Sequence, residues 1–160
     1  MIQLSIVFPV FNEVKNLPYL IDSINNVSDL NFSTEFIFVD GGSSDGSREL
    51  LDNFAKENSS IKLVCSDNSR GYGYDIVKGL NNASGDILAW THADLQTDIN
   101  DVFRAVSKLG SSTKTIVKGK RIRRNILDKI FSLLMEWYVF IKLGVKLDEI
   151  NAQPKVFRSN

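Results

Sequence analysis

A short apolar segment at residues 87–90 leads directly into side chains that could bind a metal ion. His92, Asp94 and Gln96 alternate along the chain after this segment. Alternate side chains of an extended backbone project to the same side, so we expect an imidazole, a carboxylate and an amide oxygen to lie together. Such ligands, with room left for phosphate oxygens, suit Mg²⁺ or Mn²⁺ carrying a diphosphate. The same residues are also compatible with a solvated strand end before a helix capped by Asp98.

Polar groups follow two other apolar segments. Asn12 and Glu13 come after residues 4–10 and offer an amide and a carboxylate. Asp40 comes after residues 35–39, where it could accept an N–H from a heterocyclic base. Capping of the glycine turn that follows is the alternative role of Asp40.

A loop before a predicted helix adds groups that could contact a ligand. Gly71 permits close backbone approach, and Arg70 can bind phosphate. The glycines here do not open the first helix after the first strand, and no third glycine follows at the required spacing. This spacing argues against a dinucleotide-binding dehydrogenase.

Strand-like and helix-like segments alternate along the chain. This order predicts right-handed crossovers and an α/β fold with a mostly parallel sheet flanked by helices. Ligands of such sheets bind beyond the carboxyl ends of the strands, where the polar groups above are expected. The predicted strands are 4–10, 35–39, 61–64, 87–90 and 115–118, and the predicted helices are 15–27, about 47–54, 74–82 and 99–109.

The composition fits one soluble globular domain spanning residues 1–160. Apolar residues make up 43% of the chain and charged residues 24%. Cys65 is the only cysteine, which favours a reducing, cytoplasmic compartment. Residues 1–98 carry 6 Lys/Arg against 14 Asp/Glu, whereas residues 99–160 carry 13 against 5. We expect the acidic half to bind metal and nucleotide, and the basic half to face an acceptor or a membrane.

Four segments resemble, in this order, those of family 2 nucleotide-sugar glycosyltransferases. They are residues 8–13, 38–47, 70–86 and 93–96, and the similarity extends from residue 4 to about residue 158. The Asp-Leu-Gln ending at 94–96 and the later basic segment look most like the dolichol-phosphate and polyprenyl-phosphate sugar synthases. The resemblance implies a GT-A fold and inverting transfer of a hexose from a UDP- or GDP-sugar.

The resemblance also implies site residues. Relatives usually have aspartate at position 92, and the imidazole of His92 favours Mn²⁺ over Mg²⁺. Arg121 would stabilise the leaving diphosphate, and Asp148 would act as a base or orient the acceptor. The other implied groups are Pro9, Asn12, Glu13, Asp40, Arg70, Gly71 and Asp94 for the nucleotide sugar, Asp94 and Gln96 with His92 for the metal, and Lys118, Arg123, Arg124, Gln153 and Lys155 for the acceptor or phosphate.

The basic half leads into an apolar helix. Residues 114–129 contain seven Lys/Arg and one Asp, and 13 of the 18 residues at 126–143 are apolar. Because basic and aromatic residues are not interleaved, nucleic acid is not an expected partner. The helix has too many charges to span a membrane. Two alternatives remain: burial against the sheet, or attachment to the cytoplasmic face of a membrane, with Trp137 and Tyr138 at the interface.

The sequence is compatible with three functions to different degrees. The leading prediction is a metal-dependent glycosyltransferase that uses a polyprenyl phosphate or another cell-envelope glycan precursor. Relatives usually continue with further helices, so the alternative is a truncated, non-catalytic module that binds a nucleotide sugar or a partner. A nucleotidyltransferase is disfavoured, because residues 12–16 are not the glycine- and arginine-rich loop that this class carries after its first strand.

Overall fold

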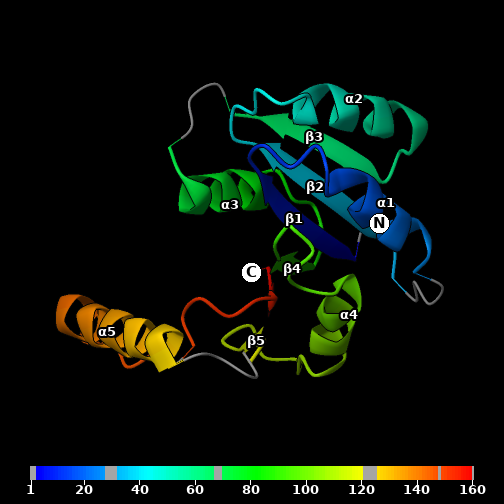
Figure 1. The fold of residues 1–160 in the computed structure, drawn as a ribbon. Helices are drawn as coiled ribbons and strands as arrows, with labels where there is room; N and C mark the ends of the chain where they lie inside the picture. Colours follow the sequence, from blue (N-terminus) through cyan, green and yellow to red (C-terminus); the bar gives the residue numbers. More distant parts are fainter. Residues whose placement is uncertain (1–2, 28–31, 67–69, 121–125, 148, 160) are drawn as a thin grey trace.

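The computed structural model describes residues 3–27, 32–66, 70–120, 126–147 and 149–159, with no side-chain description for 126–129. Figure 1 shows one α/β unit, with helices on both sides of a twisted sheet and α5 projecting away from it. The strands are β1 (Leu4–Val10), β2 (Thr34–Asp40), β3 (Ile61–Cys65), β4 (Ile87–Trp90), β5 (Ile116–Lys118) and β6 (Lys155–Arg158). The helices are α1 (Leu17–Asn25), α2 (Ser47–Glu57), α3 (Tyr72–Asn81), α4 (Ile99–Ser107) and α5 (Ile126–Leu143).

The sheet is mostly parallel, which confirms the predicted fold class. Its strand order is β3-β2-β1-β4-β6-β5, and β3, β2, β1 and β4 are mutually parallel. The order reverses beside β1, since β2 lies on one side of it and β4 on the other. The carboxyl ends of β1 and β4 therefore meet at a topological switch point, where sheets of this kind bind ligands.

One strand of the sheet was not predicted. β6 lies between β4 and β5 and runs antiparallel to both. Its sequence is only four residues long, and Val156 is its only fully buried side chain. A segment this short is decided by pairing with its neighbours rather than by its own pattern.

The core lies on both faces of β1. Every residue of β1 is buried, as expected for a parallel strand covered by helices on both sides. Helices α1, α2 and α4 cover one face, on which Phe8 and Phe38 stack with their ring centroids 4.9 Å apart. The other face carries Val7 and Val39, which approach α3 at Gly79.

Helix α5 is exposed along its described length. Phe131, Trp137 and Leu143 are 70%, 65% and 67% exposed. Of the two alternatives for this helix, burial against the sheet is wrong, because its large apolar side chains are exposed. Among the helices of the described residues, none has the length and apolar character needed to cross a membrane.

Candidate functional site

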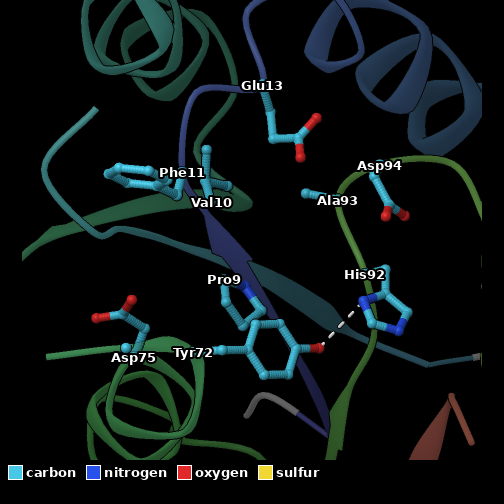
Figure 2. Close-up of a pocket in the computed structure, with 10 residues that line it drawn as sticks. Pro9, Val10, Phe11, Glu13, Tyr72, Asp75, His92, Ala93 and Asp94 are labelled. Atoms are coloured by element: carbon cyan, nitrogen blue, oxygen red, sulfur yellow. Dashed lines mark hydrogen bonds between the residues drawn. The ribbon is translucent and has the colours of Figure 1, made fainter. Parts of the chain in front are cut away.

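A pocket of about 400 Å³ opens at the carboxyl ends of β1 and β4, beside the start of α3. Figure 2 shows its side chains converging from three directions: the loop after β1, the first turns of α3 and the loop after β4. Its lining residues are Pro9, Val10, Phe11, Glu13, Gly71, Tyr72, Asp75, His92, Ala93 and Asp94. Five of them, Pro9, Glu13, Gly71, His92 and Asp94, were predicted as site residues from the sequence.

The loops after β1 and β2 are held together by hydrogen bonds. The side-chain oxygen of Asn12 accepts from the backbone N–H of Ser44 (2.9 Å), and the backbone N–H of Asn12 donates to the Ser43 hydroxyl (2.9 Å). The backbone N–H of Glu13 donates to the Ser47 hydroxyl (2.8 Å). Asn12 has φ = 58°, a conformation that asparagine tolerates better than most residues. Asn12 therefore fixes the loop that carries Glu13, and its predicted contact with the nucleotide stays a prediction.

Asp40, at the end of β2, is fully buried. Its Oδ1 accepts from the backbone N–H of Ser43 (3.0 Å), and its Oδ2 accepts from Nε of Arg48 (2.7 Å). Burial alone would raise the pKa of Asp40, but the bonds from Ser43 and Arg48 outweigh it and hold the pKa below its usual value. Asp40 is thus an ionised anchor for the loop after β2, and its predicted contact with a base stays a prediction.

His92 is oriented by a tyrosine that the sequence analysis did not identify. The hydroxyl of Tyr72 lies 3.3 Å from Nδ1 of His92, and the two rings stack with centroids 5.6 Å apart (Figure 2). The same hydroxyl lies 3.3 Å from the side-chain amide of Gln153. Partial burial and the nearby Asp94 carboxylate raise the pKa of Tyr72 to about 12, so the hydroxyl keeps its proton at neutral pH.

Gln153 joins this cluster to the sheet. In the amide orientation that satisfies both atoms, its nitrogen donates to the carbonyl of Trp90 (3.0 Å) and its oxygen accepts from the Trp90 indole (3.2 Å). Nζ of Lys155 lies 5.2 Å from the centre of the Trp90 ring. Pairing of β5 with β6 also sets Lys118 opposite Lys155. Lys118 and Lys155 therefore lie on neighbouring strands, and Gln153, which precedes β6, contacts the pocket residue Tyr72.

The alternation of side chains predicted an extended backbone in the loop after β4, but the loop is not extended throughout. Leu95 has φ = 63°, which turns the chain between Asp94 and Gln96. His92 and Asp94 line the pocket, whereas Gln96 is exposed, and its backbone N–H donates to Oδ1 of Asp94 (3.1 Å). The prediction that all three side chains project to the same side is therefore wrong for Gln96. Its contact with a metal stays a prediction.

The donor set at this loop fits a metal that is shared with a ligand. An imidazole and a carboxylate face one pocket, but the described residues contain no group of three or more His, Cys, Asp or Glu that could hold a metal. Two protein ligands leave most coordination positions to oxygens of a bound diphosphate and water, which is how Mg²⁺ and Mn²⁺ are often held. Asp98 caps α4 by accepting from the backbone N–H of Asn100 (2.9 Å), so the predicted cap is confirmed.

Asp75, in the first turns of α3, is another pocket residue that was not predicted from the sequence. It is 4% exposed, and burial raises its pKa, an effect that the side chains of Ser66 and Lys78 oppose and that Asp40 reinforces. A carboxylate inside a short helix reads as an ordinary surface group, so the sequence gives no sign of its burial. Phe11 was also missed, although an aromatic residue beside the predicted Asn12 and Glu13 was a usable signal.

Of the remaining predicted residues, some do not line the pocket and others lie outside the residues that the structure describes. Arg70 is exposed, with its guanidinium 5.2 Å from the centre of the Tyr74 ring. Arg121, Arg123, Arg124 and Asp148 lie outside the described residues, so their predicted roles in catalysis and acceptor binding stay predictions.

The chain is similar in sequence to known sugar transferases. Over 160 residues it is 39% identical to undecaprenyl-phosphate 4-deoxy-4-formamido-L-arabinose transferase of Yersinia pestis (strain Pestoides F), covering 98% of this chain and 49% of that protein. It is 30% identical over 155 residues to dolichyl-phosphate beta-glucosyltransferase of Trichomonas vaginalis, covering 88% and 48%. The chain spans about half the length of these curated relatives.

Solved structures share the fold. A mannosyltransferase of Pyrobaculum calidifontis, in complex with GDP-Man and Mn²⁺, has a TM-score of 0.68 at 19% identity, over 98% of this chain and 44% of that one. Glucosyl-3-phosphoglycerate synthase of Mycobacterium tuberculosis, with Mn²⁺, UDP and glucosyl-3-phosphoglycerate, has 0.68 at 21%, over 98% and 57%. Residues 5–157 match the model of Glycosyl transferase family 2, and the chain belongs to this family.

Proposed function

We propose that the chain is the nucleotide-sugar-binding catalytic part of a glycosyltransferase that moves a hexose from a UDP- or GDP-sugar to a polyprenyl phosphate. The observation that carries this proposal is the pocket at the switch point of the sheet, where His92 and Asp94 face Glu13 in a family 2 chain. The named relatives act on undecaprenyl and dolichyl phosphates, which supports the choice of acceptor.

The donor lies with its diphosphate toward the loop after β4. Asp94 and His92 would hold a divalent metal there, and that metal, when bound, would neutralise charge on the diphosphate. Gly71 lets the backbone approach the ligand closely, and its φ of 95° is a conformation that glycine adopts without strain. Pro9 and Glu13 lie across the pocket and limit where the nucleoside can sit.

The transfer is a direct displacement. An oxygen of the acceptor phosphate attacks the anomeric carbon, the bond from that carbon to the diphosphate oxygen breaks, and the nucleoside diphosphate leaves with the electron pair. Attack opposite the leaving group inverts the anomeric configuration. Because a phosphate acceptor is already anionic, the step needs no strong base, which leaves Asp148 to orient the acceptor and Arg121 to balance charge on the leaving group.

The acceptor approaches along β5 and β6. Lys118 and Lys155 are opposite each other on these two strands. The side chain of Gln153 contacts the hydroxyl of Tyr72, which lines the pocket. The exposed apolar face of α5 supports attachment to the cytoplasmic face of a membrane, where a polyprenyl phosphate would be held. Arg123 and Arg124 would add contacts to anionic headgroups.

A transfer assay tests the proposal. The chain is incubated with Mn²⁺ or Mg²⁺, undecaprenyl phosphate in detergent and a panel of UDP- and GDP-hexoses. Release of the nucleoside diphosphate together with formation of a glycolipid is the expected result. The two transferases named above serve as positive controls. If they are active while this chain binds the donor without transferring the sugar, the chain is a module that binds nucleotide sugars without turnover.

A further inference from the structure

The pocket has two chemically different ends. His92 and Asp94 form one end, and the ring of Tyr72 points toward it (Figure 2). The carboxyl group of Asp75 points instead to the opposite side, where Phe11 lies (Figure 2). Because a metal and the diphosphate occupy the first end under the proposed function, the second end faces the nucleoside.

Asp75 is built into this second end. Its side chain is buried, and a Cβ placed on Gly41 would lie 2.8 Å from its Oδ2, so this oxygen is held against the backbone after β2. Oδ1 is buried and has no hydrogen-bond partner within the described part of the chain. A buried carboxylate oxygen without a partner costs about 1–3 kcal/mol, more if the group is charged, and because Asp75 lines the pocket this oxygen points to a donor supplied by a ligand.

The surroundings restrict that donor. A phosphate would be repelled by Asp75 and by the charge of nearby Asp40, which itself reinforces the raised pKa of Asp75. Phe11 is 55% exposed and offers a ring face on which a base can stack. An N–H of a base is therefore the complement to Oδ1, since it also favours the ionised carboxyl group that burial disfavours.

We propose that Asp75 determines which donor base the pocket accepts, by taking a hydrogen bond at Oδ1 from a ring N–H of uracil or guanine. This inference rests on the proposed function. The corresponding ring nitrogens of cytosine and adenine carry a lone pair instead of a hydrogen, so they would face Oδ1 as two acceptors. Asp40 differs from Asp75 in that both of its oxygens are already bonded within the protein.

Calorimetric titration with UDP, GDP, CDP and ADP, each with Mn²⁺, tests this role. The parent protein should bind UDP or GDP about tenfold or more tightly than CDP and ADP, the scale of one hydrogen bond to a charged group. Asp75→Ala and the nearly isosteric Asp75→Asn should both reduce this ratio severalfold. Affinity for inorganic diphosphate with Mn²⁺ should stay within about twofold, because that ligand does not reach Asp75.

Asp22→Ala, an exposed carboxylate on α1, is the matched control and should leave all five affinities unchanged. An unchanged base ratio in both Asp75 variants would overturn the role of Asp75 while leaving the donor site intact. Equal weakening of all ligands, diphosphate included, would assign Asp75 to folding alone and also overturn it. A parent protein that binds none of the nucleotides would overturn the proposed function together with this inference.

Discussion

Two carboxyl groups near the pocket differ in what their oxygens contact. Asp40 is saturated by Arg48 and Ser43, whereas Asp94 has one oxygen bonded to its own loop, at the backbone N–H of Gln96. A saturated, buried carboxylate contributes to stability, and one that lines a pocket is available to a ligand. We therefore expect replacement of Asp40 to change stability and replacement of Asp94 to change ligand binding.

Replacing Asp40 should lower stability in a pH-dependent way. Because its pKa is lowered in the folded protein, its contribution is present above the usual aspartate pKa and is lost as the pH falls through the lower value. Asp40→Asn should therefore cost about 1–3 kcal/mol in urea unfolding at pH 7. The gap to the parent should narrow below about pH 4. Asp52→Asn, which removes an exposed pairing with Lys56, is the control and should cost well under about 1 kcal/mol.

Changing the ligands at the loop after β4 should change metal preference. Asp94→Asn should remove Mn²⁺-dependent binding of a nucleoside diphosphate, because the harder, charged oxygen is lost. His92→Asp should shift the preference from Mn²⁺ toward Mg²⁺, since a carboxylate replaces the imidazole. Titration of each ion with a fixed nucleotide measures both. Variants that titrate like the parent would place the metal away from these residues.

At the scale of elements, the strands and helices that have a clear hydrophobic pattern were predicted from the sequence. Strands β1 to β5 and helices α1 to α4 lie within a few residues of their expected positions, because the strands are apolar runs and each helix has an apolar face of period 3.6. β6 was missed because only two of its four residues, Val156 and Phe157, are apolar, and because its place between β4 and β5 is a long-range pairing. Likewise, the turn at Leu95 depends on a single backbone angle, which residue types do not specify.

The same limit applies to the site. Residues at strand ends, such as Pro9, Glu13 and Asp94, were predictable because parallel strands end at one edge of the sheet. Tyr72 and Asp75 were not, because their position depends on how α3 docks against the sheet. That docking depends on a glycine whose importance is visible only in three dimensions.

Helix α3 provides a test of this docking. A Cβ on Gly79 would lie 2.3 Å from Cγ1 of Val7 and 2.9 Å from Cγ2 of Val39. Gly79→Ala should therefore cost about 1–3 kcal/mol, despite the better helix propensity of alanine. On the same helix, a Cβ on Gly73 would meet no atom within 4 Å, so Gly73→Ala should be neutral or stabilising by up to about 1 kcal/mol. Chemical denaturation measures both, and equal effects would contradict close packing at Gly79.

At the scale of the whole molecule, charge and apolar surface are separated. Residues 1–98, which carry an excess of acidic side chains, contain all the residues that line the pocket. Residues 99–160, which carry an excess of basic side chains, include α5 with its exposed apolar side chains. An exposed apolar helix next to basic residues has the two features that attach a protein to an anionic membrane surface. Under the proposed function, attachment through α5 would bring the pocket to the membrane that holds the polyprenyl phosphate.

Vesicle flotation tests this arrangement. The chain should float with vesicles that contain phosphatidylglycerol and less with vesicles of phosphatidylcholine alone, because each Lys or Arg near an anionic surface contributes about 1 kcal/mol. High salt should weaken binding by screening those charges. Trp137→Glu should reduce flotation further, since it places a charge on the exposed face of α5. Tyr19→Glu, at a 67% exposed aromatic residue of α1, is the control and should float like the parent. A chain that stays unbound at low salt, or a Trp137 variant that floats as well as the parent, would exclude α5 as the membrane contact and favour an acceptor delivered in solution.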